Sequence, residues 1–193
     1  VCIMEGQKVL LDSGYTPIEN VKKGDKINGS EVVKVTKQKT TEQLIKIPKN
    51  TFGTNIPTTD VYLTHDHIVC ANQQLHNAGM LTYSHKNIIP CDPPKQHVYN
   101  ILLKEWQVIN VDNLPCESLC PYQEESVQEL ISQGIHDHTF RDFVNDFSKN
   151  VETTDDLVIK NGYIMPKNMK LQNNTPTNTP PTHTTQIQNT VSL

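Results

Sequence analysis

The residue best placed for covalent chemistry is a cysteine one peptide bond from the start of the chain. Cys2 follows Val1, and its thiol can attack the carbonyl carbon of that residue through a five-membered intermediate. The attack replaces the amide by a thioester, provided that another group protonates the departing amide nitrogen. The chemistry therefore needs a proton donor from elsewhere in the chain.

A polar run that begins at Thr64 holds two histidines suited to this task. Histidine exchanges a proton near neutral pH because its unperturbed pKa is about 6.5. His65 and His67 can alternatively be metal ligands, as in metal-dependent hydrolases. Such enzymes need a fuller set of ligands, which is not evident in the rest of the sequence, so we expect no metal.

Short β-strands must position these residues, because β-branched and aromatic runs alternate with turn signals as far as residue 121. Strands are expected at residues 7–11, 15–21, 31–36, 42–47, 60–70, 80–83, 87–89, 97–103 and 106–111. The last two look like a central pair. No long run with helical period interrupts the series, which favours an all-β barrel or sandwich.

The composition changes after residue 121. Apolar residues at helical spacing over 127–135 and 140–147 predict two short amphipathic helices broken near Gly134. An Asn-Gly pair between two apolar runs predicts a hairpin over residues 157–165. We divide the chain into a processing domain (1–120), a helical and hairpin extension that packs on it (121–165) and a disordered tail rich in Asn, Thr and Pro (166–193).

Charge and cysteine content exclude several classes of function. The net charge is -4 with 17 Lys plus Arg, and no basic run with interleaved aromatics favours nucleic acid or an anionic membrane. No apolar run approaches the roughly 20 residues that span a bilayer. The five cysteines are an odd number without framework spacing, which favours free thiols in a reducing compartment such as the cytoplasm and leaves a Cys116–Cys120 pair open.

Three segments in order resemble Hint domains, the self-processing module shared by hedgehog proteins and inteins. The opening stretch over residues 1–27, the Thr-x-x-His element at Thr64 to His67 and the closing strands over residues 98–118 carry the likeness. The last segment is similar to the bacterial and viral intein-like branch. The resemblance covers about residues 1–120 and implies a horseshoe-like all-β fold, with short helices, a hairpin and a tail following it.

The resemblance also implies roles for single residues. Cys2 would be the nucleophile, Thr64 would hold the scissile bond between Val1 and Cys2, and His67 would donate a proton to its nitrogen. Thr64 and His67 cannot share a face of a regular strand at their spacing, so a bend near Asp66 is required. Asp66 and Asn100 are possible supporting residues, because Asn100 replaces an aspartate of inteins and could orient the thioester by hydrogen bonding.

Departures from the family narrow the expected reaction. Splicing inteins end in a His-Asn pair, whereas residues 113–118 read Asn-Leu-Pro-Cys-Glu-Ser here, so we do not expect full splicing. No carboxylate stands near Thr36 and Lys37, where hedgehog proteins carry an acid, so cholesterol transfer is unsupported.

We expect self-cleavage before Cys2 without a cofactor. The partner would be a covalently linked upstream polypeptide, since the chain begins at Val1 without a Met, and water or a small nucleophile would accept the acyl group. The alternative is an inactive Hint fold that serves as a binding or structural module.

Overall fold

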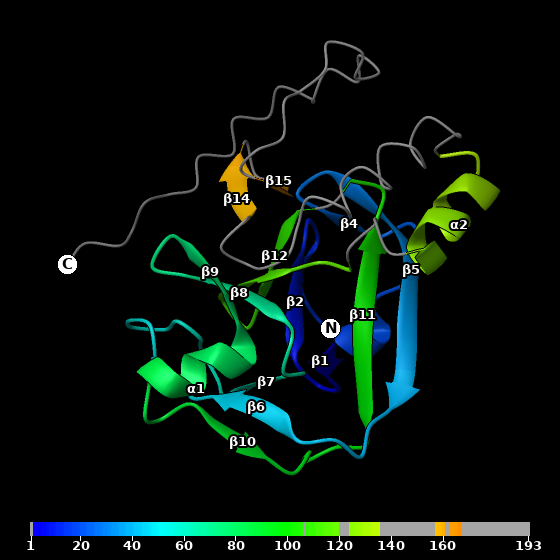
Figure 1. Ribbon diagram of the computed structural model, residues 1–193. Coiled ribbons are helices and arrows are strands. Elements are labelled where there is room, and N and C mark those ends of the chain that lie inside the picture. The colour runs from blue at the N-terminus through cyan, green and yellow to red at the C-terminus, as the bar shows by residue number, and fades with distance from the viewer. Residues whose placement is uncertain (1, 106, 120–123, 136–156, 161–162, 167–193) are drawn as a thin grey trace.

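Two antiparallel sheets make up most of the molecule, as the strand pattern predicts. The computed structural model describes residues 2–105, 107–119, 124–135, 157–160 and 163–166. The seven-stranded sheet has the order β10-β6-β7-β1-β11-β5-β4 and the six-stranded sheet has the order β3-β2-β12-β13-β8-β9 (Figure 1).

The first sheet is organised around β1, which is only two residues long. Its strands are β10 (Ile89–Cys91), β6 (Leu44–Ile47), β7 (Val61–Leu63), β1 (Ile3–Met4), β11 (His97–Leu103), β5 (Ser30–Lys39) and β4 (Lys26–Ile27). β1 lies between β7 and β11, and Ile3 pairs with Leu63 on one side and with Tyr99 on the other. The start of the chain is therefore held inside the sheet.

The second sheet is built from short hairpins. Its strands are β3 (Gly14–Pro17), β2 (Lys8–Leu11), β12 (Val108–Val111), β13 (Leu114–Glu117), β8 (Ile68–Ala71) and β9 (Gln74–Asn77). Strands β11 and β12 do not form the expected central pair. β11 pairs with β1 and β5 in the first sheet, and β12 pairs with β2 and β13 in the second. Both strands are apolar because each one is interior to its own sheet.

The main core joins the two sheets. Apolar side chains from both contribute to one cluster of buried residues that includes Ile3, Val9, Leu63, Val69, Ile101 and Ile109. Alternation along β1 sends Ile3 into this core and leaves Cys2 and Met4 on the other face, where Leu44 and Val98 cover them. The pleat of β1 thus separates the cysteine from the main core.

One expected strand is helical, and another is shorter than expected. Residues 80–83 belong to a short 3-10 turn (η2, Ala78–Met80) and the helix α1 (Leu81–Ser84). Local hydrogen bonds from Thr82 Oγ1 to the carbonyl of Gly79 and from Ser84 Oγ to that of Leu81 stabilise the turn, and only Leu81 among residues 80–84 is buried. The expected strand over 15–21 likewise ends in a 3-10 turn (η1, Ile18–Asn20).

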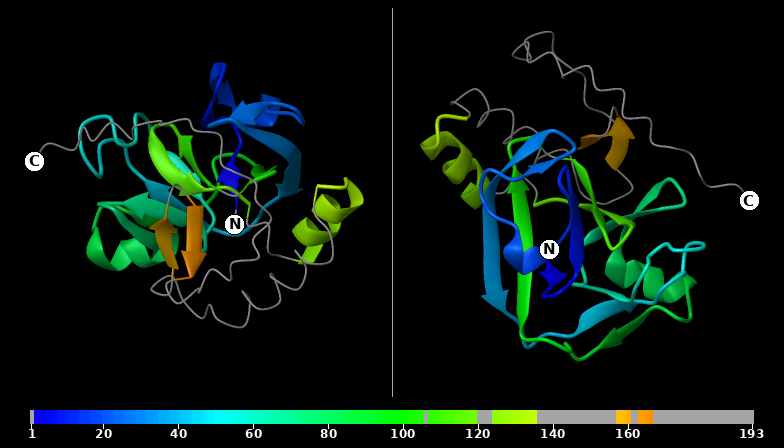
Figure 2. Two further views of the ribbon diagram at one scale, coloured as in Figure 1. Left: turned by 90° about the horizontal axis from the view of Figure 1, so that it is seen from above. Right: turned by 180° about the vertical axis from the view of Figure 1, so that it is seen from behind.

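The extension after residue 121 is described in two pieces. The helix α2 (Glu124–Ser132) covers the outer side of β5 and β11, because Leu130 packs on Val33 and Leu102. Helices α1 and α2 lie at opposite sides of the molecule (Figure 2). None of the described helices is long and apolar enough to cross a membrane.

The predicted hairpin is confirmed. β14 (Leu157–Lys160) pairs antiparallel with β15 (Tyr163–Pro166). The second expected helix at 140–147, the disordered tail after residue 166 and Cys120 lie outside the described residues. Cys116 has a free thiol.

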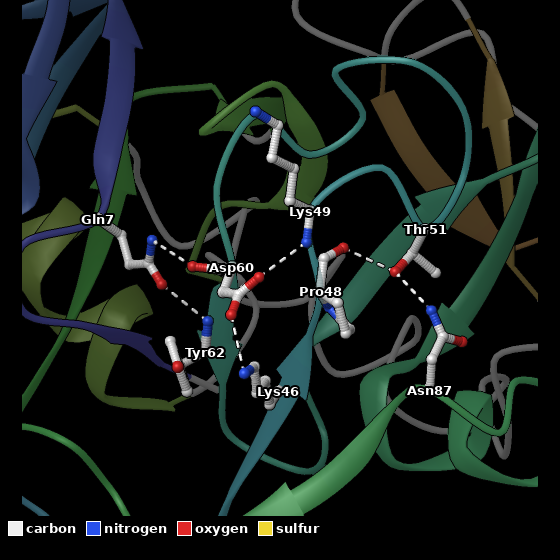
Figure 3. Close-up of polar contacts among 8 residues, drawn as sticks. All are labelled: Gln7, Lys46, Pro48, Lys49, Thr51, Asp60, Tyr62 and Asn87. Atoms are coloured by element: carbon white, nitrogen blue, oxygen red, sulfur yellow. Dashed lines mark hydrogen bonds and ion pairs between the residues drawn. The ribbon is translucent and has the colours of Figure 1, made fainter.

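A buried glutamine ties β7 to the turn between β12 and β13. Gln7 Nε2 donates to Asp112 Oδ2 at 2.6 Å. It also donates to the carbonyl of Asp60 at 3.3 Å, and Gln7 Oε1 accepts the amide of Tyr62 at 2.8 Å (Figure 3). Asp60 in turn forms an ion pair with Lys46 at 2.8 Å. The network holds β7, and hence the loop after it, against the start of the chain.

Replacing this glutamine should cost stability. Gln7→Ala leaves the Asp112 carboxylate and the Tyr62 amide without their buried partner, and we expect a loss of about 1–3 kcal/mol in the free energy of unfolding. Denaturant unfolding measures the change. The matched control is Gln74→Ala, because Gln74 is an exposed residue of β9 and should change stability by no more than about 0.5 kcal/mol. Equal effects of the two substitutions would contradict the role of the network.

Candidate functional site

The thiol of Cys2 is buried beneath the first sheet. The residue is 5% exposed and packs with Met4, Leu44 and Val98. Burial raises the pKa of the Cys2 thiol above its ordinary value. From the described part of the chain, Gln38 Nε2 on β5 donates to Cys2 Sγ at 3.3 Å and would stabilise a thiolate there. The sulfur is therefore protonated at neutral pH, with a hydrogen-bond donor beside it.

Thr64 forms hydrogen bonds with both the N–H and the carbonyl group of Cys2. The Cys2 N–H donates to Thr64 Oγ1 at 2.7 Å, and the Thr64 N–H donates to the carbonyl of Cys2 at 3.0 Å. The strand register fixes this contact. Ile3 pairs with Leu63, and Thr64 directly follows Leu63 at the end of β7, which sets it beside Cys2. The nitrogen that Thr64 holds is the one that joins Cys2 to Val1. Val1 itself lies outside the described residues.

The bend predicted near Asp66 is confirmed. The His67 N–H donates to the carbonyl of Thr64 at 3.1 Å, which closes a turn with residues 65 and 66 at its tip. The turn sends His67 inward and leaves Asp66 exposed. A hydroxyl and an imidazole three residues apart are thereby brought to the same side of the chain, which a regular strand cannot do.

His65 and Asp66 do not join Cys2. Their side chains are 62% and 77% exposed and form a pair with each other, with His65 Nδ1 at 2.8 Å from Asp66 Oδ1. The His65 ring rests on Gly79, where an added Cβ would come within 2.0 Å of Nε2. His65 and His67 thus face opposite directions. The described residues contain no group of three or more His, Cys, Asp or Glu that could hold a metal ion.

His67 is fully buried without a hydrogen bond to either ring nitrogen from the described part of the chain. Burial lowers its pKa from 6.5 to about 3, although contacts of the ring with the backbone of Glu117 and Cys2 oppose the shift. A buried polar group without a partner costs about 1–3 kcal/mol. The structure thus holds a buried, neutral imidazole next to the Cys2 backbone.

Asn100 lies on the other side of Cys2 from Thr64. Continuing the antiparallel register of β1 and β11 by one residue sets Asn100 opposite Cys2, since Ile3 pairs with Tyr99. The side chain is 1% exposed, and its Oδ1 accepts the amide of Ile101 at 2.9 Å. Asn100 thus lies opposite Cys2 on the neighbouring strand, whereas the Asp66 side chain is exposed and pairs with His65. The supporting roles of both residues stay predictions.

Sequence reasoning missed Glu117, which the end of β13 brings to the same place. It is 4% exposed, and its Oε1 accepts the N–H of Ile68, the residue after His67, at 3.0 Å. Burial raises the pKa of Glu117 from 4.5 to about 7. A carboxylate inside the apolar stretch over residues 114–119 was the available signal. Gln38 was also missed, and no signal marked it, because polar residues are common on an exposed strand.

The comparisons with known proteins identify the family of this chain. A family model described as "Hint domain" matches residues 1–123. The chain belongs to the Hint domain family. Hint domains are in general self-processing modules. The intein-like ones are embedded in larger polypeptides.

A solved structure is also similar to this Hint domain. The solution structure of a bacterial intein-like domain from Clostridium thermocellum is 20% identical, with a TM-score of 0.48, and the match covers 61% of this chain and 97% of that chain. No curated protein matches the sequence.

Proposed function

We propose that this Hint domain cuts the peptide bond before Cys2 by an N-to-S acyl shift followed by release of the thioester. The observation that carries the proposal is the hydrogen bond from the Cys2 nitrogen to Thr64 Oγ1. The ring of His67, which has no hydrogen bond from the described residues, lies beside the Cys2 backbone. Hydrogen bonds that fix the amide and a nearby proton carrier are the two requirements of the shift. We assign Thr64 to the first requirement and His67 to the second.

The reaction forms a bond between Cys2 Sγ and the carbonyl carbon of residue 1 while the bond from that carbon to the Cys2 nitrogen breaks. Thr64 Oγ1 holds the nitrogen in place, and His67 delivers the proton that makes it a leaving amine. Gln38 stabilises the sulfur as it loses its own proton, and Asn100 orients the carbonyl from the neighbouring strand. Water or an added nucleophile then attacks the thioester and releases the upstream polypeptide.

The reaction should stop at cleavage. An asparagine that could cyclise is missing at the end of β13, where Glu117 is followed by Ser118. The β-branched side chain of Val1 crowds the thioester carbonyl, so hydrolysis should be slow and added nucleophiles should accelerate release. The division into a processing domain ending near residue 120 and an extension packed on it belongs to the same proposal.

The test is a precursor with a reporter protein fused before Val1. Incubation with hydroxylamine or dithiothreitol should release the reporter, and mass spectrometry should place the cut between Val1 and Cys2, with the hydroxamate or thioester on the reporter. An unmutated precursor that stays intact would overturn the proposal and favour the alternative of an inactive binding or structural module. A cut at any other bond would overturn it as well.

A further inference from the structure

Ile101 is the residue of β11 that faces the point where an upstream polypeptide would join the first sheet. Backbone groups along an antiparallel strand point alternately to its two neighbours. The carbonyl of His97 faces β1, because it accepts the Glu5 N–H at 3.0 Å. The register of Ile3 with Tyr99 continues this alternation along β11. One step further, the backbone N–H and carbonyl of Ile101 point to the same side.

Residue 1 would be the partner of Ile101 if an upstream polypeptide continued β1. The antiparallel register, extended by two places from Ile3, sets the two residues opposite each other. In such a pair each N–H donates to the carbonyl of the other residue, so the scissile carbonyl would accept the Ile101 N–H. The alternation agrees with this pairing, because the N–H and carbonyl of Cys2 point the other way, to Thr64 after β7.

Both of the Ile101 groups that would hold residue 1 are already bonded. The Ile101 N–H donates to Asn100 Oδ1 at 2.9 Å, and the Ile101 carbonyl accepts the Leu119 N–H at 2.7 Å. The Leu119 nitrogen therefore stands where the nitrogen of residue 1 would stand in a continued ladder. Asn100 is 1% exposed and Ile101 is fully buried, so both bonds are shielded from water.

Leu119 is held in this place from two directions. Its side chain packs against the buried cluster of Val33, Leu102 and Leu130, which joins β5, β11 and α2. On its other side, β13 ends at Glu117, two residues earlier, and pairs with β12 and β8. These contacts use no atom of residue 1, so they persist when an upstream polypeptide is attached.

We propose that Leu119 and Asn100 end the ladder at Cys2 and turn the upstream polypeptide out of the sheet. The carbonyl of residue 1 then meets the side chain of Asn100 rather than the ladder of β11. Its oxygen can leave the amide plane as Cys2 Sγ attacks, which the change to a tetrahedral carbon requires. Leu119 and Asn100 are positioning residues. Their effect on rate rests on the proposed cleavage, whereas the exit from the sheet does not.

The direct test measures hydrogen exchange at the amide of residue 1 in a Cys2→Ala precursor with a reporter fused before Val1. This amide should exchange within about tenfold of the rate of an unstructured peptide, because Leu119 occupies its acceptor. Incorporating leucic acid in place of Leu119 changes the N–H to an ester oxygen and vacates the Ile101 carbonyl. Exchange at residue 1 should then slow by about three- to tenfold, the equivalent of one hydrogen bond.

The cleavage rate gives a second readout when Cys2 is retained. Dithiothreitol is the nucleophile of choice, because it does not cleave an oxygen ester. The ester at residue 119 should slow release of the reporter by about three- to tenfold, because the unreacted peptide gains a ladder bond that the attack must break. Asn100→Ala vacates the Ile101 N–H and should also slow release. Asn100→Asp keeps an acceptor oxygen and should stay closer to the unmutated rate.

Two matched variants separate loss of this hydrogen bond from loss of packing or of stability. Leu119→Ala removes the side chain but keeps the N–H, so exchange at residue 1 should stay fast. An ester at residue 135 removes the hydrogen bond from the Ile135 N–H to the Leu130 carbonyl, 3.0 Å long, at the end of the same extension. It should change neither readout. Thermal unfolding of each precursor checks that the fold is retained.

The outcomes separate this inference from the proposed function. Slow exchange at residue 1 in the precursor that retains Leu119 would overturn the inference and needs no variant at residue 119. A folded ester variant that alters neither exchange nor rate would overturn it too. An unmutated precursor that never cleaves would overturn the proposed function, while the exchange measurement still decides where the upstream polypeptide leaves the sheet.

Discussion

Cys2→Ala is expected to abolish release of an upstream reporter. Removing Sγ removes the only atom that can attack the carbonyl of residue 1 through a five-membered ring, and the amide that remains does not react with hydroxylamine or dithiothreitol under mild conditions. The hydrogen bonds of the Cys2 backbone to Thr64 use no side-chain atom of Cys2 and should persist. Gel analysis of the precursor over several days measures the loss.

A second free cysteine provides the matched control for this substitution. Cys70 lies on β8 and is partly buried, and its pKa is raised, as that of Cys2 is. It does not contact the Cys2 nitrogen that Thr64 holds. Cys70→Ala should cleave at the unmutated rate. Cleavage that survives Cys2→Ala, or that disappears in both variants, would contradict the role of Cys2 as the nucleophile.

His67→Ala should slow cleavage by about 10²–10⁴-fold, the usual contribution of a general acid or base. The side chain is the only imidazole that the described structure places against the Cys2 backbone. Without the imidazole, the departing amide nitrogen has no proton carrier beside it and must leave unprotonated. Cleavage rates with saturating hydroxylamine measure the effect, and His67→Gln, which fills the site without exchanging protons, should be slowed to a similar extent.

His65 serves as the control for the neighbouring imidazole. It is two residues away and 62% exposed, so His65→Ala should leave the rate within about twofold of the unmutated protein. Stability gives a second readout. The folded-state pKa of His67 lies below 6.5, so the protein loses stability as pH falls from 6.5 to about 3, and His67→Gln should lose less. A large loss of rate in His65→Ala would favour the metal-hydrolase alternative instead.

Much of the arrangement around Cys2 could be inferred from residue spacing. The i, i+3 separation of Thr64 and His67 required a turn, and the structure contains that turn, with a hydrogen bond between their backbones. The pattern of apolar residues likewise gave most strands of both sheets and the hairpin after residue 157. These features depend on contacts between residues close in sequence, which local patterns record.

Pairing between distant strands could not be read in the same way. Strands β11 and β12 are both apolar and adjacent in sequence, yet they enter different sheets, because an interior strand needs buried neighbours on both sides and either sheet can supply them. Residues 80–83 were expected as a strand and form a helix instead, since side-chain hydrogen bonds within the turn outweigh a weak β preference.

The sequence alone determined which cysteine, threonine and histidine we propose for the chemistry of this Hint domain, because the resemblance to the family rests on the types and order of these residues. Only the tertiary structure decided which protons they have available. Burial lowers the pKa of His67 and raises that of Glu117, which favours the neutral form of each side chain. This burial depends on strands more than 40 residues apart in the chain. Electrostatic environment is a property of the folded molecule, so no local pattern around Glu117 could predict its raised pKa.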